Sequence, residues 1–483
     1  MKIAMIASEI APFAKSGGLA DVVGTLSLAL EDLGHEVSLI MPAYRSVLQG
    51  NFALEDSGEK LSIPISARQV EGSVLTARLG NNITVYLVRA DAYFDREYLY
   101  GTPQGDYGDN PERFVFFCRS AMEILRRHPV QIVHCHDWQA ALALVFLKAQ
   151  PERYAEMAEA KTVFTIHNLG FQGVFWAPDW HLLNLDPGFF TPQYLEFYSN
   201  INFLKGALIF AEKITTVSPN YAREIIETEQ GFGLEGVLRE RAKDLVGILN
   251  GVDYNVWNPE TDPWIPKHYS KEKISNKSAC KKHLQASFSL PATAALPLIG
   301  MISRLTAQKG FDLVEKGFER LMERPLQMIL LGSGEPHYED FFRACAARFP
   351  DQFAAQIGFD EPLAHQIEAG ADIFLMPSQY EPCGLNQMFS LKYGTLPIVR
   401  AVGGLKDTVE DYDPETSAGT GFVFGPYDAE SLLAKVDRSL EVFSQKRKWA
   451  VLRRRAMSMD FSWQRSAREY SSLYEKLFSG ENG

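Results

Sequence analysis

The chain has 483 residues, 46% hydrophobic and 22% charged, a balance typical of a globular protein and enough for two domains. A net charge of −12 argues against nucleic acid or an anionic membrane as the main partner, and we expect no targeting or transmembrane segment. Five scattered cysteines without a Cys-x-x-Cys pair predict neither a disulfide framework nor a zinc ribbon, which fits a cytoplasmic location.

Strand-like runs alternate with helical patterns along the chain. A first series covers 2–8, 36–41, 83–88, 131–136, 162–167 and 213–217; a second covers 246–250, 298–303, 326–332, 372–377, 396–399 and 421–424. Strands separated by helices form parallel sheets covered on both faces. We therefore predict an α/β fold with two doubly wound, Rossmann-like domains, 1–245 and 246–458. We predict that residues 250–266 connect the two domains and that 267–278 begin a helix of the second domain.

A glycine pair follows the first strand, in Lys15-Ser16-Gly17-Gly18-Leu19-Ala20-Asp21. Helical spacing of apolar residues begins at Leu19, and Gly34 closes that helix. Residues without Cβ let a ligand approach the backbone, and a helix N-terminus favours an anion. Lys15 adds a mobile positive charge, although an ordinary turn with a solvated lysine remains an equal alternative. The pattern returns at 403–407 after another strand, which predicts a second Gly-Gly turn facing a shared deep cleft.

Ligands of open α/β sheets bind beyond the carboxyl ends of the strands, where polar residues recur here. They are His136, Asp137, His167, Asn250, Arg304, Lys309 and the run from Ser378 to Cys383. Singly, each has a plain alternative, such as a core histidine, a solvated helix start or a capping carboxylate. Arg304 and Lys309 place two cations at one strand–helix junction, which suits a dianionic phosphate group. His134 with His136 lacks further metal ligands, so we expect no metal and no cofactor.

Six sequence motifs, spread along the chain, resemble those of a known protein family. The motifs are Lys15-x-Gly17-Gly18-Leu19-Ala20-Asp21-Val22, His136-Asp137-Trp138, Thr165-Ile166-His167-Asn168-Leu169, Asn250-Gly251-Val252-Asp253, Ser303-Arg304-Leu305-x-x-Gln308-Lys309-Gly310 and Pro377-Ser378-x-x-Glu381-Pro382-Cys383-Gly384-Leu385. Together they resemble the bacterial glycogen synthases and plant starch synthases, retaining glycosyltransferases of the GT-B type. The resemblance spans essentially the whole chain in register. It implies that the last segment, 459–483, is a helix that crosses back to the first domain.

The resemblance also implies a role for individual residues. On the donor side, it implies that Lys15, Gly17, Gly18 and Asp21 lie beside the phosphates and the sugar, and that Arg304 and Lys309 bind the pyrophosphate. It places Glu381 on the transferred glucose and Phe359 against the base. The phosphate-binding loop would consist of Cys383, Gly384, Leu385 and Asn386. His167 would sit beside the anomeric carbon, Asn250 would bind a sugar hydroxyl, and Asp137 would line the acceptor side. Phe389 stands eight residues after Glu381, where the wider superfamily has a second carboxylate.

The implied activity is glucose transfer from ADP-glucose to the non-reducing end of an α-1,4-glucan with retention of configuration. Because the motifs offer no second carboxylate, we expect front-face displacement rather than a covalent glycosyl-enzyme. Alternatives are a related enzyme using UDP-glucose or another acceptor, and a non-catalytic glucan-binding scaffold. A dinucleotide oxidoreductase is disfavoured because the first turn lacks Gly-x-Gly-x-x-Gly. The basic clusters 446–448 and 453–455 read as a solvated helix face.

Overall fold

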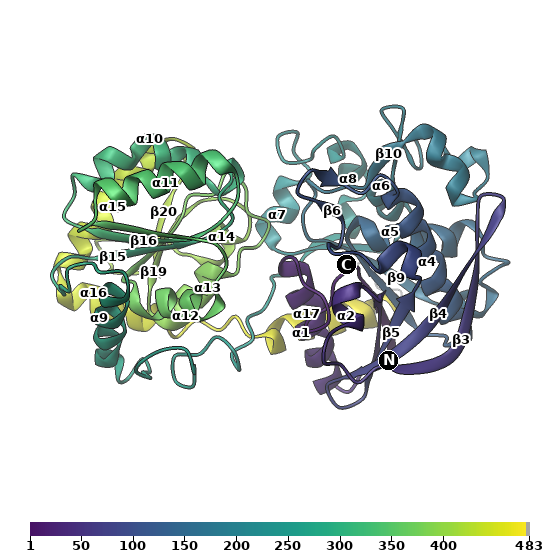
Figure 1. Cartoon of the computed structure of the whole chain (residues 1–483), viewed down its shortest axis with the longest axis horizontal. Coiled ribbons are helices and arrows are strands. Elements are labelled where there is room, and N and C mark those ends of the chain that lie inside the picture. Colours follow the sequence, from purple (N-terminus) through teal and green to yellow (C-terminus); the bar gives the residue numbers. More distant parts are fainter. Residues whose placement is uncertain (480–483) are drawn as a thin grey trace. The chain divides into compact units, whose positions relative to one another are not determined.

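The computed structural model describes residues 1–479, which divide into two compact units (Figure 1). The first unit holds residues 1–217 and 222–251 together with the C-terminal helix α17 (Trp463–Ser479). The second unit holds 218–221 and 252–462. Within the described residues, no helix combines the length and the apolar character needed to cross a membrane.

The first unit is built on a nine-stranded sheet in the order β14-β13-β9-β8-β1-β2-β5-β4-β3. The strands are β1 (Lys2–Ile6), β2 (Glu36–Pro42), β3 (Glu55–Ile65), β4 (Arg68–Leu79), β5 (Ile83–Arg89), β8 (Ile132–His136), β9 (Lys161–Ile166), β13 (Lys213–Thr216) and β14 (Leu245–Gly247). Pairing is parallel from β14 to β5, whereas β4 and β3 add an antiparallel edge. The chain extends the sheet from β1 in one direction and from β8 in the other. Neighbouring β1 and β8 therefore form a topological switch point, where α/β proteins bind ligands.

Helices cover both faces of this sheet. The longer ones are α1 (Gly18–Asp32), α4 (Asn110–Arg127), α5 (Asp137–Ala149) and α6 (Phe203–Phe210). Because right-handed crossovers run in opposite directions from the switch point, α1 lies on the face opposite α5 and α6. The packing agrees, since α1 contacts α17 while α5 contacts α4 and α6. Helix α17 also donates from Ser466 Oγ to the Leu249 carbonyl at 2.6 Å, so the last helix packs on the first unit. It begins at Trp463 rather than at 459, and residues 480–483 of the predicted segment lie outside the described residues.

Shorter elements complete the first unit. They are α2 (Arg45–Leu48), α3 (Asp91–Phe94), α8 (Glu235–Glu240), the hairpin of β6 (Gly101–Thr102) and β7 (Gly105–Asp106), and the small sheet of β10 (Val174–Trp176), β12 (Asn200–Asn202) and β11 (Glu196–Phe197). Helix α7 (Pro219–Glu224) spans a point at which the chain changes unit.

The second unit has a six-stranded, fully parallel sheet in the order β17-β16-β15-β18-β19-β20. Its strands are β15 (Leu298–Ile302), β16 (Gln327–Gly332), β17 (Phe353–Ile357), β18 (Ile373–Met376), β19 (Leu396–Arg400) and β20 (Phe422–Phe424). Figure 1 shows α10 (Phe311–Met322) and α11 (Pro336–Arg348) on one side of the sheet, with α9 (Lys277–Ser287), α12 (Glu361–Gly370) and α13 (Asn386–Tyr393) on the other. Helix α15 (Ala429–Ser444) packs on α10, and α16 (Lys446–Ala456) packs on α13. Here β15 and β18 flank the switch point.

The predicted α/β class with two doubly wound halves is confirmed, with three corrections. The assignment of the run at 246–250 to the second series is wrong, because its strand, β14, pairs with β13 in the first sheet. The β3–β4 hairpin and the edge strand β17 were not predicted. The helix expected within 267–278 starts only at Lys277, after a short 3₁₀ turn at Ile274–Asn276.

Candidate active site

The glycine turn after β1 presents an open backbone. Gly17 is the N-cap of α1, both glycines are exposed, and a Cβ added at either would meet no atom within 4 Å. Lys15 forms an ion pair in this structure, with its Nζ 2.8 Å from Oδ1 of Asp21 in the first turn of α1. About half of the lysine side chain remains exposed, so a bound anion can compete for its ammonium group.

A buried carboxylate that the sequence reasoning missed fixes this turn. Glu9 is 4% exposed and accepts from both the backbone N–H and the hydroxyl of Ser16, the latter at 2.7 Å. It also accepts from the Tyr100 hydroxyl at 2.6 Å. The acidic residue next to β1 was the only available signal, since Tyr100 lies 91 positions away in the sequence.

The β8–α5 junction brings three predicted residues together. Nδ1 of His136 lies 3.0 Å from Nε2 of His167, and the Asp137 carboxylate accepts from the backbone N–H of His167 at 2.8 Å. Burial lowers the pKa of His167 to about 3, so its imidazole is neutral at physiological pH. Burial raises the pKa of Asp137 to about 7, opposed by backbone hydrogen bonds from His167 and Asn168. Asp137 therefore holds the His167 backbone in place.

Asn250 lies in the first unit, not in the second as predicted, because it follows β14. The residue is 6% exposed, and its Oδ1 has no hydrogen-bond partner among residues 1–479. A buried amide oxygen without a partner is costly unless a ligand satisfies it. Asn250 is therefore a candidate ligand-binding residue on structural grounds as well.

The second unit brings Lys309 and Glu381 together across its switch point. Nζ of Lys309 lies 2.7 Å and 2.9 Å from the two carboxylate oxygens of Glu381, and Ser378 Oγ donates to the same carboxylate at 3.1 Å. The side chains are 19% and 7% exposed, so this ion pair is largely shielded from water. Arg304, by contrast, is exposed and makes no side-chain hydrogen bond or ion pair within the described part of the chain.

The loop after Glu381 leads into α13, whose N-cap is Leu385. Gly384 has φ +70°, and a Cβ there would lie 2.5 Å from Oε1 of Gln387. Asn386 opens the helix and donates from Nδ2 to the Ile302 carbonyl at 2.9 Å, which ties the loop to the end of β15. Cys383 is buried at the centre of this turn. The helix N-terminus, Arg304 and Lys309 thus belong to neighbouring loops, a suitable setting for a phosphate group.

The second glycine pair is packed rather than open, which corrects the prediction. Gly403 has φ +41°, and a Cβ there would lie 1.9 Å from the carbonyl oxygen of Glu381. A Cβ at Gly404 would lie 2.2 Å from the Cys383 carbonyl oxygen, and the Gly404 N–H donates to the Glu381 and Pro382 carbonyls at 3.2 Å. These glycines let α14 (Gly403–Thr408) pack against the loop that carries Glu381.

Two aromatic residues of the second unit differ in their surroundings. Phe359 follows β17 and is 86% exposed, so its ring is available to a planar ligand. Phe389, eight residues after Glu381, is buried and stacks on Trp257 with a ring-centroid distance of 4.0 Å. This position therefore serves packing.

The basic clusters of α16 are only partly solvated, which corrects the prediction of a solvated face. Burial lowers the pKa of Arg453, and Arg455 Nη1 donates to the Ser417 carbonyl at 2.9 Å. Lys446, Arg447 and Arg454 do remain exposed.

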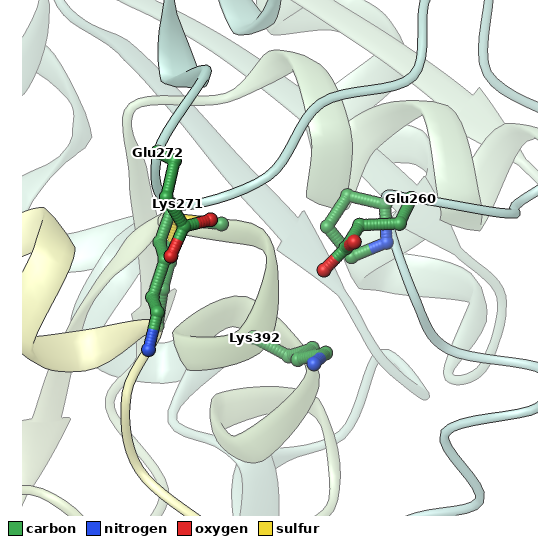
Figure 2. A pocket seen from close by; sticks show the side chains of 6 residues that line it. Glu260, Lys271, Glu272 and Lys392 are labelled. Atoms are coloured by element: carbon green, nitrogen blue, oxygen red, sulfur yellow. The ribbon is translucent and has the colours of Figure 1, made fainter.

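A surface pocket of about 210 Å³ also lies in the second unit. It is lined by Pro259, Glu260, Lys271, Glu272, Lys392 and Met457, and Figure 2 shows its charged side chains. None of the residues predicted for the site lines this pocket. Within residues 1–479, no group of three or more His, Cys, Asp or Glu side chains is placed to hold a metal ion.

Known proteins resemble the chain over its full length. Residues 2–240 match the starch synthase catalytic domain family, and residues 286–450 match the glycosyl transferases group 1 family. A glycogen synthase of Koribacter versatilis is 48% identical over 99% of this chain and 98% of its own length. Another, from Anaeromyxobacter sp., is 47% identical over 99% of both.

Solved structures also match this chain. The catalytic domain of starch synthase IV from Arabidopsis thaliana, described as bound to ADP and acarbose, matches with a TM-score of 0.90, 33% identity and 99% coverage of both chains. A sucrose-phosphate synthase from Thermosynechococcus elongatus, 18% identical over 99% of this chain and 100% of its own, shares the fold with a TM-score of 0.62. The chain therefore has the GT-B fold and belongs to the glycogen synthase and starch synthase family of glycosyltransferases.

Proposed function

We propose that this protein transfers glucose from ADP-glucose to the non-reducing end of an α-1,4-glucan, with retention of the anomeric configuration. The observation that carries the proposal is the shielded Lys309–Glu381 pair together with the exposed Arg304, which has no side-chain partner among residues 1–479. A sugar nucleotide contains a pyrophosphate next to a neutral sugar. The two cations suit the pyrophosphate, and the carboxylate of Glu381 can accept hydrogen bonds from the sugar hydroxyls. The glycogen synthases of similar sequence support the acceptor, and the ADP in the starch synthase IV structure supports the adenine base.

Two cations neutralise the leaving group in this scheme. When the bond between the anomeric carbon and the phosphate oxygen breaks, negative charge develops on ADP. Arg304 offers a forked guanidinium and Lys309 an ammonium that Glu381 already positions at 2.7 Å. The amides at the start of α13 add partial positive charge. On the sugar side, Glu381 contacts the transferred glucose, and Phe359 stacks on the adenine.

Residues of the first unit act on the sugar and on the acceptor. Lys15 and the open amides of Gly17 and Gly18 bind the donor, with Asp21 holding the lysine. Asn250 accepts a hydrogen bond from a sugar hydroxyl through Oδ1, which has no partner in the described part of the chain. The neutral His167 lies beside the anomeric carbon and adds no positive charge to the cationic transition state. Asp137 supports it from the acceptor side.

The chemical step is a front-face displacement. The bond from the anomeric carbon to the ADP oxygen breaks, the bond from the acceptor hydroxyl oxygen to that carbon forms, and the acceptor proton passes to the departing phosphate oxygen. The second carboxylate position holds the buried Phe389, so no residue there can form a covalent glycosyl-enzyme. Water must be excluded so that the acceptor, and not hydroxide, receives the glucose.

The proposal is tested by incubating purified protein with labelled ADP-glucose and glycogen. We expect label in the polymer, released again by an exo-acting α-glucosidase, since retention gives an α-linkage. Lys309→Ala should lower kcat/KM by about 10²- to 10³-fold. Lys316→Ala is the matched control, because Lys316 is an exposed lysine on α10 paired with Asp312. A protein that binds glycogen but incorporates no glucose would instead be a scaffold, and label resistant to the α-glucosidase would exclude retention.

A further inference from the structure

The ring of His167 touches a second histidine that the proposed reaction does not use. His136 is the last residue of β8 and is fully buried. Its Nδ1 lies 3.0 Å from Nε2 of His167, and its other ring nitrogen, Nε2, is buried without a partner among the described residues. Beyond it, the ring of His134 packs on His136 with a centroid distance of 4.1 Å.

His134, which packs on the His136 ring, is itself held by hydrogen bonds at both of its ring nitrogens. Nδ1 of His134 lies 2.8 Å from the Tyr474 hydroxyl on α17, and its Nε2 lies 2.6 Å from Oγ1 of Thr165. Both ring nitrogens of His134 therefore have partners of their own. The only hydrogen bond of the His136 ring within residues 1–479 is the one to His167.

The contact between His136 and His167 has one donor. Burial lowers the pKa of His167 to about 3 and that of His136 well below its ordinary value, so both rings are neutral and each carries one N–H. If His167 donated, His136 would carry its proton on Nε2, which is buried and has no acceptor among the described residues. If His136 donates, Nε2 is only a lone pair without a donor. Buried N–H groups without acceptors are rarer than unfilled acceptors, so His136 is the donor.

We propose that His136 is a positioning residue that fixes His167 in the tautomer with its proton on Nδ1. Nδ1 of His167 makes no hydrogen bond within the described residues, and the residue is only partly buried. It is therefore the nitrogen that meets the substrate, and it meets it as a donor. Asp137 fixes the backbone of His167 and His136 fixes its ring, both from the same β8–α5 junction.

This assignment deepens the proposed function and rests on it where the substrate is concerned. A neutral Nδ1–H donates to an oxygen of the transferred glucose. It cannot take the acceptor's proton, because the lone pair of His167, on Nε2, is occupied by the His136 N–H. The acceptor proton must then leave by another route, which fits its transfer to the departing phosphate oxygen.

The tautomer is measured directly on the wild-type protein by long-range ¹H–¹⁵N NMR of ¹⁵N-histidine-labelled enzyme. The His167 signals are assigned by their loss in His167→Ala. We expect Nδ1 of His167 to have the shift of a protonated, pyrrole-type nitrogen and Nε2 that of an unprotonated, pyridine-type nitrogen. The opposite assignment would overturn the proposal. This readout does not depend on whether the protein uses ADP-glucose.

A pair of variants tests the consequence for catalysis. His136→Asn keeps an N–H donor near the place of Nδ1, whereas His136→Leu fills a similar volume without one. We expect the leucine variant to lose roughly 10- to 100-fold in kcat, by analogy with the loss when the hydrogen-bond partner of a metal-binding histidine is removed, with little change in KM. The asparagine variant should recover much of that loss. Equal kcat values for two variants that unfold at the same temperature would contradict the role of His136, while full activity of His167→Ala would instead remove His167 from the proposed mechanism.

Discussion

Replacing Gly403 by alanine tests whether the second glycine pair supports the loop that carries Glu381. A Cβ at this position would lie 1.9 Å from the Glu381 carbonyl oxygen. The carbonyl would have to move by roughly 1.5 Å to reach the 3.4 Å at which ordinary contact begins. The residue also has φ +41°, a conformation that alanine rarely adopts.

The cost of this substitution has two parts. The left-handed backbone costs about 1–2 kcal/mol for a residue with a Cβ. Forcing an extra carbon into a packed site costs about 1–3 kcal/mol. The variant should therefore lose about 2–5 kcal/mol of unfolding free energy. Because the displaced carbonyl belongs to Glu381 itself, a shift of about 1 Å in the reacting groups should also lower kcat/KM by roughly 100-fold.

Calorimetric unfolding and initial rates with ADP-glucose and glycogen measure both effects. Gly425→Ala is the matched control, since its Cβ would meet no atom within 4 Å and its φ is not positive. The control should keep both the stability and the rate of the wild type. If Gly403→Ala were as stable and as active as the control, the supporting role of the glycine pair would be refuted.

Three further substitutions separate binding from folding. Arg304→Ala should lower kcat/KM by about 10²- to 10³-fold without changing the unfolding free energy, because the side chain has no partner in residues 1–479; an unchanged rate would exclude it from the phosphate site. Asn250→Ala should lower kcat/KM with little loss of stability, because removing a buried oxygen that has no partner within residues 1–479 offsets the lost packing; the reverse result would make it a structural residue. Asp137 has a pKa raised to about 7 when folded, so its contribution to stability falls as pH rises from about 4 to about 7. Wild type should lose stability relative to Asp137→Asn over that window in denaturant titrations, and a constant difference would contradict the shift.

The sheets could be predicted where their strands are buried on both faces. After the exposed Lys2, β1 is buried and apolar, and β8 is buried throughout, which is typical of parallel strands covered on both faces. The β3–β4 hairpin was not predicted, because β3 is polar over its first half and begins with an exposed Glu-Asp pair. The sheet to which β14 belongs depends on its pairing with β13, a tertiary contact that no local pattern reports.

The site followed from strand ends, and its missing parts are long-range contacts. His167, Lys309 and Glu381 each follow a strand, so the rule for open α/β sheets found them. The role of Glu9 was not predicted, because its hydrogen-bond partner Tyr100 is distant in the sequence. The two Gly-Gly-Leu-x-Asp patterns looked equivalent, yet Gly17 is open and Gly403 is packed against a carbonyl. A local pattern does not reveal which backbone lies across from it.

The most direct test of the central claim is a comparison of two donors. Purified protein receives ADP-glucose or UDP-glucose at equal concentration with glycogen, and label entering the polymer is measured over time. We predict efficient incorporation from ADP-glucose, with UDP-glucose used far less well. Preferential incorporation from UDP-glucose would contradict the assigned donor, and incorporation from neither would contradict the proposed activity as a whole.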